Sequence, residues 1–375
     1  MSEYAKGFAP TIEGHTALQS LTRAIVAAAS DDDERAFPAA TFSVLRRHGI
    51  LAPARTRVPS TLPLLRLQAA VGRGDLGTGR IFEGHVNALD LIGRFGTAAH
   101  AADAYGDAAA GHLFAVWNTD APGHPLTVAA DGDRLRLNGA KSFASGVDGV
   151  TRALVTASDQ QRGRVMLLLP LEPDRERVDR SWWRPLGMRN SVSHMIDLDG
   201  RIVTSGQVVG TAGDYLRQPW FGAGAIRFAA VQVGGMHAVF DAAREHLVGA
   251  GRASAPYQRH RLAQMAMAVE SGYGWLDRAA AAWDRGCRGA IDADSADAAA
   301  AVAYANLTRS AVEEFCMRVV ELAQRAVGCA GLIEPHPLER RLRDLMVYLR
   351  QPDPDGALAQ AGDAVAEAAL EPGGW

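Results

Sequence analysis

A β-rich stretch in the middle of an otherwise helical sequence constrains the fold most. Residues 113–212 contain short apolar or alternating runs: LFAVWNT (113–119), RLRLNG (134–139), RALVTA (152–157), RVMLLLP (164–170) and HMIDLDG (194–200). Gly, Asp, Asn and Pro separate these runs, as they do in the turns between strands. We expect an antiparallel sheet or barrel domain here, with a cofactor in the crevice between it and its helical neighbours.

The two flanking blocks are helical. Residues 1–112 place apolar side chains at helical spacing, for example Leu18, Leu21 and Ile25, and predict an N-terminal helical domain. Residues 213–375 predict an antiparallel four-helix bundle. Its long amphipathic stretches are 221–248, 256–286, 293–328 and 335–349, followed by a last helix near 355–370. The Gly234-Gly235 pair allows either close helix packing or a kink. The predicted fold class is α+β.

Composition excludes several function classes. The chain of 375 residues has a net charge of −3 and no Lys/Arg run, so we expect no nucleic-acid partner. Its three cysteines lack metal-ligand spacing with His, which predicts reduced thiols, no metal site and a cytoplasmic protein. The N-terminus has no apolar core, and Arg227 and Gln232 interrupt the most apolar window. We therefore expect no signal peptide and no membrane span.

Five motifs, in this order, resemble the acyl-CoA dehydrogenase superfamily over nearly the whole chain. They are FPAATFSVLRRHGILAP (37–53), AVWNTDAPG (115–123), LNGAKSFASG (137–146), PLGMRNSVS (185–193) and GCAGLIEPHPLERRLRD (328–344). The resemblance implies an acyl-CoA dehydrogenase-like fold and an FAD cofactor. It also implies α,β-oxidation of an acyl thioester, on CoA or a carrier protein, with electrons passing to a partner protein.

The resemblance also assigns residues to the flavin ring. A flat isoalloxazine needs an apolar wall and a few hydrogen-bond donors. By position, the cofactor-binding residues are Trp117, Asn118, Thr119, Phe143, Ala144 and Ser145. The first three would line the pyrimidine side of the ring. Phe143 would replace the family's Trp as the wall, and the Ser145 hydroxyl would replace that of the Thr near N5.

A second subunit is expected to complete the FAD site. In the family, an Arg early in the bundle and a Gly-rich turn bind the pyrophosphate and adenine of the neighbouring subunit's FAD, because these groups need cations and backbone N–H groups. Arg252, Gly328 and Gly331 occupy the matching positions here, although the Phe-Gly pair that usually follows the Arg is missing. This predicts a homodimer or homotetramer.

The catalytic base departs from the family pattern. A dehydrogenase needs a carboxylate that removes the α-proton, but the two family positions hold Pro352 and Ile226. Asp353 and Asp355 are the nearest acids to the first position and are the candidate bases, since a nitroalkane-oxidising branch uses Asp there. We therefore expect a poor dehydrogenase toward straight-chain acyl-CoAs.

Three functions remain open. The favoured one is an FAD-dependent oxidoreductase acting on an acyl thioester or a related C–H acid. The second is a flavin monooxygenase of the same fold, which needs no carboxylate base and takes reduced flavin from a reductase. The third is an idle paralogue that binds an acyl ligand. Further candidates are His124, His194 and His237 as acid/base groups, and the pair Trp182-Trp183 near the substrate mouth.

Overall fold

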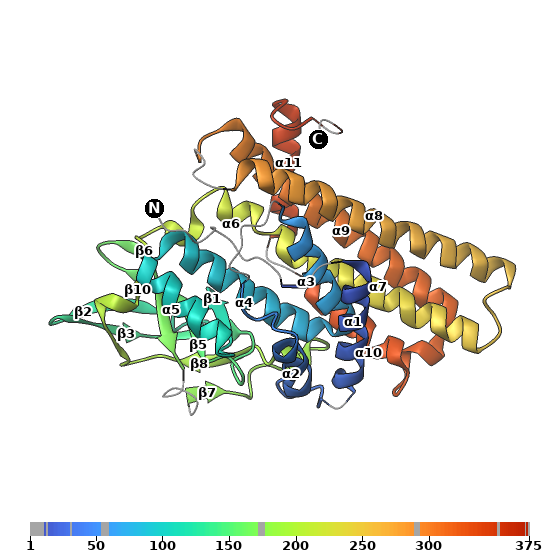
Figure 1. Cartoon of the computed structure of the whole chain (residues 1–375), viewed down its shortest axis with the longest axis horizontal. Coiled ribbons are helices and arrows are strands. Elements are labelled where there is room, and N and C mark those ends of the chain that lie inside the picture. Colours follow the sequence, from blue (N-terminus) through green and yellow to red (C-terminus); the bar gives the residue numbers. More distant parts are fainter. Residues whose placement is uncertain are drawn as a thin grey trace.

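The computed structural model describes residues 11–12, 14–30, 32–53, 60–171, 177–288, 293–350, 353–371 and 373. Five helices come first: α1 (His15–Ala29), α2 (Ala39–Arg47), α3 (Leu62–Gly74), α4 (Leu76–Phe95) and α5 (Ala98–Ala109). The strands follow, and a bundle of long helices ends the chain (Figure 1). The α+β class and the acyl-CoA dehydrogenase-like order of helices, strands and bundle predicted from the sequence are confirmed.

The β domain contains two sheets. Its strands are β1 (Phe114–Trp117), β2 (Thr127–Asp131), β3 (Arg134–Asn138), β4 (Ala140–Ala144), β5 (Arg152–Asp159), β6 (Gly163–Pro170), β7 (Val178–Asp179), β8 (His194–Asp197), β9 (Ile202–Val203) and β10 (Val208–Val209). One sheet has the order β10-β6-β5-β2-β3-β9, with β1 also paired to β5, and the other has the order β4-β8-β7. The first sheet is mixed rather than purely antiparallel, because β1 and β2 both run parallel to β5.

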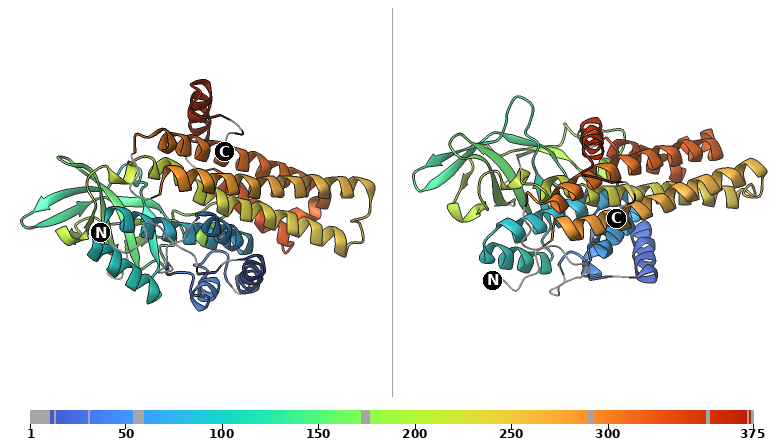
Figure 2. Two further views of the ribbon diagram at one scale, coloured as in Figure 1. Left: turned by 45° about the horizontal axis from the view of Figure 1, so that its top comes forward. Right: turned by 90° about the horizontal axis from the view of Figure 1, so that it is seen from above.

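The bundle consists of α6 (Trp220–Ala223), α7 (Ile226–Gly249), α8 (Pro256–Gly286), α9 (Ala296–Val327), α10 (Pro337–Tyr348) and α11 (Pro354–Ala366). Its long helices extend away from the strands along the longest axis of the molecule (Figure 2). The glycine pair in α7 packs closely and does not end the helix. A Cβ at Gly234 would lie 2.1 Å from the Ala69 carbonyl oxygen of α3, so only glycine permits this helix crossing.

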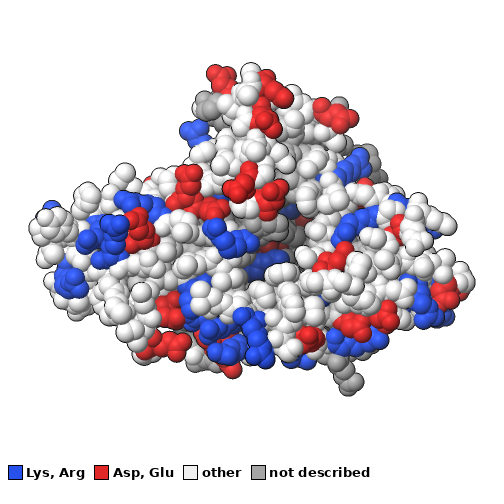
Figure 3. Space-filling model, turned by 180° about the vertical axis from the view of Figure 1, so that it is seen from behind, with Lys and Arg blue, Asp and Glu red and all other residues white. Residues whose placement is uncertain are grey.

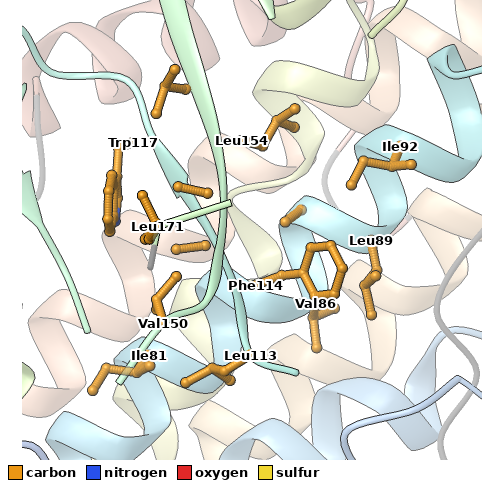
Figure 4. Close-up of a cluster of buried hydrophobic side chains, with 14 of the residues drawn as sticks. Ile81, Val86, Leu89, Ile92, Leu113, Phe114, Trp117, Val150, Leu154 and Leu171 are labelled. Atoms are coloured by element: carbon orange, nitrogen blue, oxygen red, sulfur yellow. The ribbon is translucent and has the colours of Figure 1, made fainter. Parts of the chain in front are cut away.

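Two hydrophobic cores hold the molecule together. One joins α4 to the sheet, where Phe82, Phe114, Trp117 and Leu154 are buried (Figure 4). The other joins α3 and the start of α4 to the bundle. The α4 helix therefore lies between the β domain and the bundle, and it carries side chains into the space where they meet. Among the described helices, none is long and apolar enough to cross a membrane.

Candidate functional site

The two strand segments predicted to bind the flavin lie side by side. The chain leaving β1 runs along β4, where Ser142 N donates to Thr119 O over 3.0 Å. Lys141 Nζ donates to Asn118 O at 2.8 Å and to Asp120 Oδ1 at 2.6 Å. Burial lowers the pKa of Lys141 to about 8, against the opposing effect of Asp120. This ion pair ties together the segments that carry Thr119, which is exposed, and Ser145, which is 7% exposed.

Two of the predicted residues face inward instead. The Trp117 side chain is 1% exposed, and its Nε1 donates to Ser145 O at 3.1 Å. The Ala144 methyl group is fully buried. The resemblance implied that Trp117 and Ala144 bind the flavin ring. Their side chains cannot line it, and these residues can reach the ring only through their backbone. Trp117 supports the segment that carries Ser145.

Phe143 presents an aromatic ring beside this surface. It has a φ of 51°, at an irregularity in the β4–β8 pairing, and it is 50% exposed. Its ring packs edge-on against Trp182 and Trp183, with centroids 4.8 and 5.9 Å apart. A left-handed conformation in a bulky residue costs about 1–3 kcal/mol and is concentrated at functional sites. The exposed Phe143 ring and the half-buried Trp182 and Trp183 rings form an aromatic wall of the kind that a flat cofactor requires.

Of the three histidines singled out in the sequence, only His194 lies at this surface. It pairs with Ala144 in the β4–β8 register, and its Nε2 is 3.8 Å from Asp148 Oδ2. Burial lowers its pKa from the usual value, although Asp148 acts in the opposite direction. His124 is exposed on a β-domain loop, whereas His237 lies within the bundle against Tyr273. His194 is therefore the histidine best placed to act on a bound group.

A polar stripe lies on α4, the helix that packs against both β1 and α7. The residues Arg80, Glu83, Asn87, Asp90 and Arg94 follow one another at spacings of three and four. Arg80 Nη1 binds Glu83 Oε2 at 2.6 Å, and Asn87 Nδ2 donates to the other Glu83 oxygen. Asp90 lies within 3.6 Å of both Arg94 and Arg227. Sequence analysis missed this stripe, although five polar residues on one face of an otherwise apolar helix were the signal for it.

Two tyrosines close the polar region around Glu83. Burial raises the pKa of Tyr215 to about 12, and the neighbouring Glu83 carboxylate adds to this shift. Burial and Glu83 also raise the pKa of Tyr348, at the end of α10. Asn87 Oδ1 is buried without a hydrogen-bond partner in the described parts of the chain, so a donor is missing there. The region is suited to hydrogen-bonding groups and not to an alkyl chain.

Arg164 links this polar region to the predicted flavin strand. Its Nη2 donates to Asn118 O at 2.7 Å, and its Nε donates to Thr156 Oγ1 at 3.0 Å. The Arg164 charge also lowers the pKa of Tyr215, so the guanidinium lies near that phenol. Through Arg164 and Tyr215, the Glu83 part of the α4 stripe lies close to Asn118 at the end of β1, and we call this junction of α4 with the β1–β4 edge the crevice. Figure 3 shows the molecule hollowed near its middle, with acidic and basic side chains around the hollow.

The candidate bases do not lie in this crevice. Asp353 caps α11, since its Oδ1 accepts the Gly356 N–H at 3.1 Å, and Asp355 is exposed in the first turn of that helix. An Asn306–Gln360 hydrogen bond attaches α11 to α9. Figure 1 shows α11 at the top of the view and β8, the partner of β4, near the bottom. Ile226 is buried in α7, and Pro352 lies outside the described residues.

The residues predicted to bind a neighbour's FAD lie at the far end of the bundle. Arg252 follows α7, and Gly328 and Gly331 follow α9. Hydrogen bonds from Gln258 to Ala326 O and between His246 and His336 join these turns. The strands occupy the opposite end of the longest axis (Figure 1). A single chain therefore does not bring Arg252 and the glycine turn together with Phe143 and Ser145.

A cavity of about 710 Å³ lies elsewhere, between α1, α3, α7 and α10. Arg73, Arg340 and Arg341 line it, together with Asp75 and Asp344. It contains none of the residues predicted to bind the flavin. Its arginines are largely paired with these and neighbouring acids, for example Arg73 with Asp241 at 2.7 Å and Arg340 with Asp75 at 2.8 Å.

Comparisons with known proteins agree with this architecture. Residues 213–349 match the sequence family described as "Acyl-CoA dehydrogenase, C-terminal domain". No curated protein sequence matches the chain at a significant level.

Several solved structures share the fold at low sequence identity. TdsC of Paenibacillus sp. A11-2, in complex with FMN and indole, is 17% identical, with a TM-score of 0.81 over 94% of this chain and 96% of its own. Methanesulfinate monooxygenase MsuC of Pseudomonas fluorescens is 17% identical, with a TM-score of 0.80 over 94% and 97%. A nitrososynthase of Micromonospora carbonacea var. africana is 20% identical, with a TM-score of 0.77 over 94% and 95%. The chain thus has the acyl-CoA dehydrogenase-like fold, and residues 213–349 match the C-terminal domain of that family.

Proposed function

We propose that this protein is a flavin-dependent monooxygenase that takes reduced FMN from a partner reductase and oxygenates a polar organic substrate. The observation that carries the proposal is the orientation of the acids near the family's base position. Asp353 holds the N-terminus of α11 and Asp355 is exposed beside it, so neither faces the crevice. The acids of the α4 stripe, Glu83 and Asp90, are already paired with arginines. Proton abstraction from an acyl thioester needs a carboxylate free to accept a proton beside the substrate, whereas oxygen transfer does not.

The residues at the β1–β4 edge fit the ring half of a flavin. The exposed Phe143 packs against the half-buried Trp182 and Trp183 as an aromatic wall, and the adjoining segments carry the hydroxyl groups of Thr119 and Ser145. When bound, the flavin would supply the activation of oxygen. The residues expected to hold the ADP half of FAD lie at the far end of the bundle. FMN is therefore the flavin that one chain can hold by itself. TdsC has been solved with FMN, which supports the same choice.

The α4 stripe supports a polar substrate. Glu83, Asn87 and Asp90 are at most partly exposed, and Arg80, Arg164 and Tyr215 surround the same crevice. An alkyl chain placed here would strip these groups of water and give no hydrogen bond in return, which costs about 1–3 kcal/mol per group. Nitrososynthase and MsuC share this fold, and both names imply oxidation of a polar group. A small amine or sulfinate therefore suits the crevice better than a long-chain acyl thioester.

A coupled assay tests the proposal. The protein is mixed with FMN, an NADH-dependent flavin reductase, oxygen and a panel that includes methanesulfinate, a nucleotide-linked amino sugar and dibenzothiophene. We expect at least one polar compound to gain an oxygen atom, detected by mass spectrometry. Phe143→Ala should weaken binding of reduced FMN about tenfold, since an aromatic contact contributes about 0.5–1.5 kcal/mol. Leu358→Ala, at an exposed position on α11, is the control and should leave binding unchanged.

Three results would contradict the proposal. The first is a protein that binds neither oxidised nor reduced flavin at micromolar concentration. The second is a flavin-loaded protein that acyl-CoA reduces rapidly without oxygen. Oxygen consumption that yields only hydrogen peroxide with every substrate class would reject the monooxygenase reaction while leaving the flavin site intact.

We also infer a homodimer or homotetramer formed through the bundle. Several large apolar side chains of the bundle are exposed, namely Val248, Met267, Met317, Leu332 and Ile333. Exposed apolar side chains that gather into a patch mark interaction sites in other proteins, and we take these positions as the candidate contact. Light scattering at micromolar concentration should give a mass that is a multiple of 39.8 kDa. Replacing Met267 and Met317 by Glu should lower that mass, and a monomeric wild-type protein would show the inference to be wrong.

A further inference from the structure

Three buried serines form a chain of hydroxyl groups behind the aromatic wall. Ser145 Oγ lies 2.9 Å from Ser193 Oγ, and Ser193 Oγ lies 2.8 Å from Ser191 Oγ. Ser191 Oγ in turn lies 2.8 Å from Met188 O. The exposed fractions of Ser145, Ser191 and Ser193 are 7%, 1% and 3%. The chain therefore connects the predicted flavin surface to a backbone carbonyl within the protein.

The direction of each hydrogen bond follows from counting protons. A hydroxyl group has one proton to donate and two lone pairs, whereas a carbonyl oxygen only accepts. Ser191 must therefore donate to Met188 O, which leaves Ser193 to donate to Ser191 and Ser145 to donate to Ser193. The alternative acceptors, Ser191 O for Ser193 and Phe143 O for Ser145, lie at 3.5 Å, the limit of a hydrogen bond. The reverse order would keep the two Ser–Ser contacts but leave Ser191 Oγ 2.8 Å from Met188 O with no proton between the two oxygens, so only the first order satisfies all three short contacts.

The carbonyl at the end of the chain is held firmly. Met188 N donates to Asp344 Oδ1 of α10 at 2.6 Å, and Trp183 Nε1 donates to Met188 O at 3.2 Å. A Cβ at Gly187 would lie 2.2 Å from Arg343 O, so this turn lies directly on α10. The end of the chain is therefore anchored by α10 on one side and by the aromatic wall on the other. The polarity of the serine chain is set by the fold and not by solvent.

We propose that Ser191 and Ser193 are positioning residues that make Ser145 Oγ a hydrogen-bond acceptor and thereby favour reduced FMN over oxidised FMN. The N5 atom of oxidised flavin has a lone pair and needs a donor, whereas N5 of reduced flavin carries a hydrogen and needs an acceptor. With its proton committed to Ser193, Ser145 offers only lone pairs toward the ring. The inference rests on the proposed function, because it takes the flavin ring to lie against β4. It adds a reason why the reduced form is the one captured from a reductase.

The test is the ratio of two dissociation constants, measured without turnover. Oxidised FMN is titrated in air and reduced FMN under anaerobic conditions, each by ultrafiltration. Ser193→Ala frees the Ser145 proton, so we expect the preference for reduced FMN to fall about tenfold, which is about 1.4 kcal/mol and near the upper end of what one hydrogen bond contributes. Ser191→Ala breaks the chain at a second point and should lower the preference as well. Ser193→Thr keeps the hydroxyl and should restore most of it.

Ser142→Ala is the matched control. Ser142 lies in the same strand, is 1% exposed and donates to Asp120 O at 2.9 Å, but it is not part of the serine chain. This variant should keep the wild-type ratio. If Ser193→Ala and Ser191→Ala bind FMN with the wild-type ratio, the inference is wrong while the proposed function stands. If the wild-type protein binds neither form of FMN, both proposals are wrong.

Discussion

Anaerobic mixing of the FMN-loaded protein with butyryl-CoA or octanoyl-CoA is expected to leave the flavin absorbance unchanged on the timescale of a dehydrogenase. A positioned general base contributes about 10²–10⁴-fold to such a reaction. The two family positions for that base hold Ile226 and Pro352, neither of which can accept a proton. The polar stripe on α4 also disfavours the alkyl chain in the crevice.

Asp353→Asn and Asp355→Asn make this prediction specific. Both acids lie on α11, which packs on α9, so neither substitution should alter any slow bleaching by more than twofold. Asn is as good an N-cap as Asp, so Asp353→Asn should also leave α11 in place. The prediction would be contradicted if acyl-CoA reduced the wild-type flavin rapidly and the rate of reduction fell a hundredfold or more in either variant. That result would also contradict the position of α11.

Glu83→Gln is the informative variant if the wild-type protein does oxidise a thioester. Glu83 is one of the two buried carboxylates of the α4 stripe, and both of its oxygens already accept hydrogen bonds, from Arg80 and from Asn87. Gln keeps the shape and removes the charge. A loss of bleaching confined to this variant would assign the proton abstraction to α4, a position that the family comparison does not suggest.

The sequence predicted the order of the elements because their signals are local. The long helices of the bundle follow from helical periodicity, and the strands follow from short runs between turns. The pairing of β1 and β2 parallel to β5 could not be predicted, because it depends on contacts between segments far apart in the chain. The same holds for the packing of α3 on α7, which the sequence indicated only through a glycine pair that allowed two interpretations.

The sequence predicted which strand segments contribute to the candidate site. It did not predict the directions in which individual side chains of the site point. The segments that carry Thr119 and Ser145 do lie side by side, and the role of these two residues at a flavin stays a prediction. Trp117 follows the same motif, but the alternation of strand side chains turns it into the core. Asp353 is one residue from the family's base position, yet a left-handed backbone with a φ of 52° makes it a helix cap. Neither orientation can be obtained from the sequence, because each is fixed by tertiary packing.

The largest expected effect on stability comes from Asp75→Ala. Asp75 lies between α3 and α4 and its side chain is 5% exposed. Its Oδ2 accepts from Thr78 N at 2.8 Å and from Asn190 Nδ2 at 2.9 Å, and its Oδ1 accepts from Arg340 Nη2 at 2.8 Å. The substitution removes the N-cap of α4, and it removes the carboxylate that pairs with the partly buried Arg340 guanidinium. We expect the free energy of unfolding to fall by about 3–5 kcal/mol.

Urea unfolding compares Asp75→Ala with two other variants. Asp75→Asn keeps the cap but loses the ion pair to Arg340, so it should lose less stability than Asp75→Ala. Asp131→Ala removes an exposed pair with Arg136 and should lose less than about 1 kcal/mol. Because Asp75 also holds Asn190, next to Ser191, Asp75→Ala should weaken the preference for reduced FMN as well. If Asp75→Ala is no less stable than Asp131→Ala, then α4, the serine chain and α10 are not joined through this carboxylate.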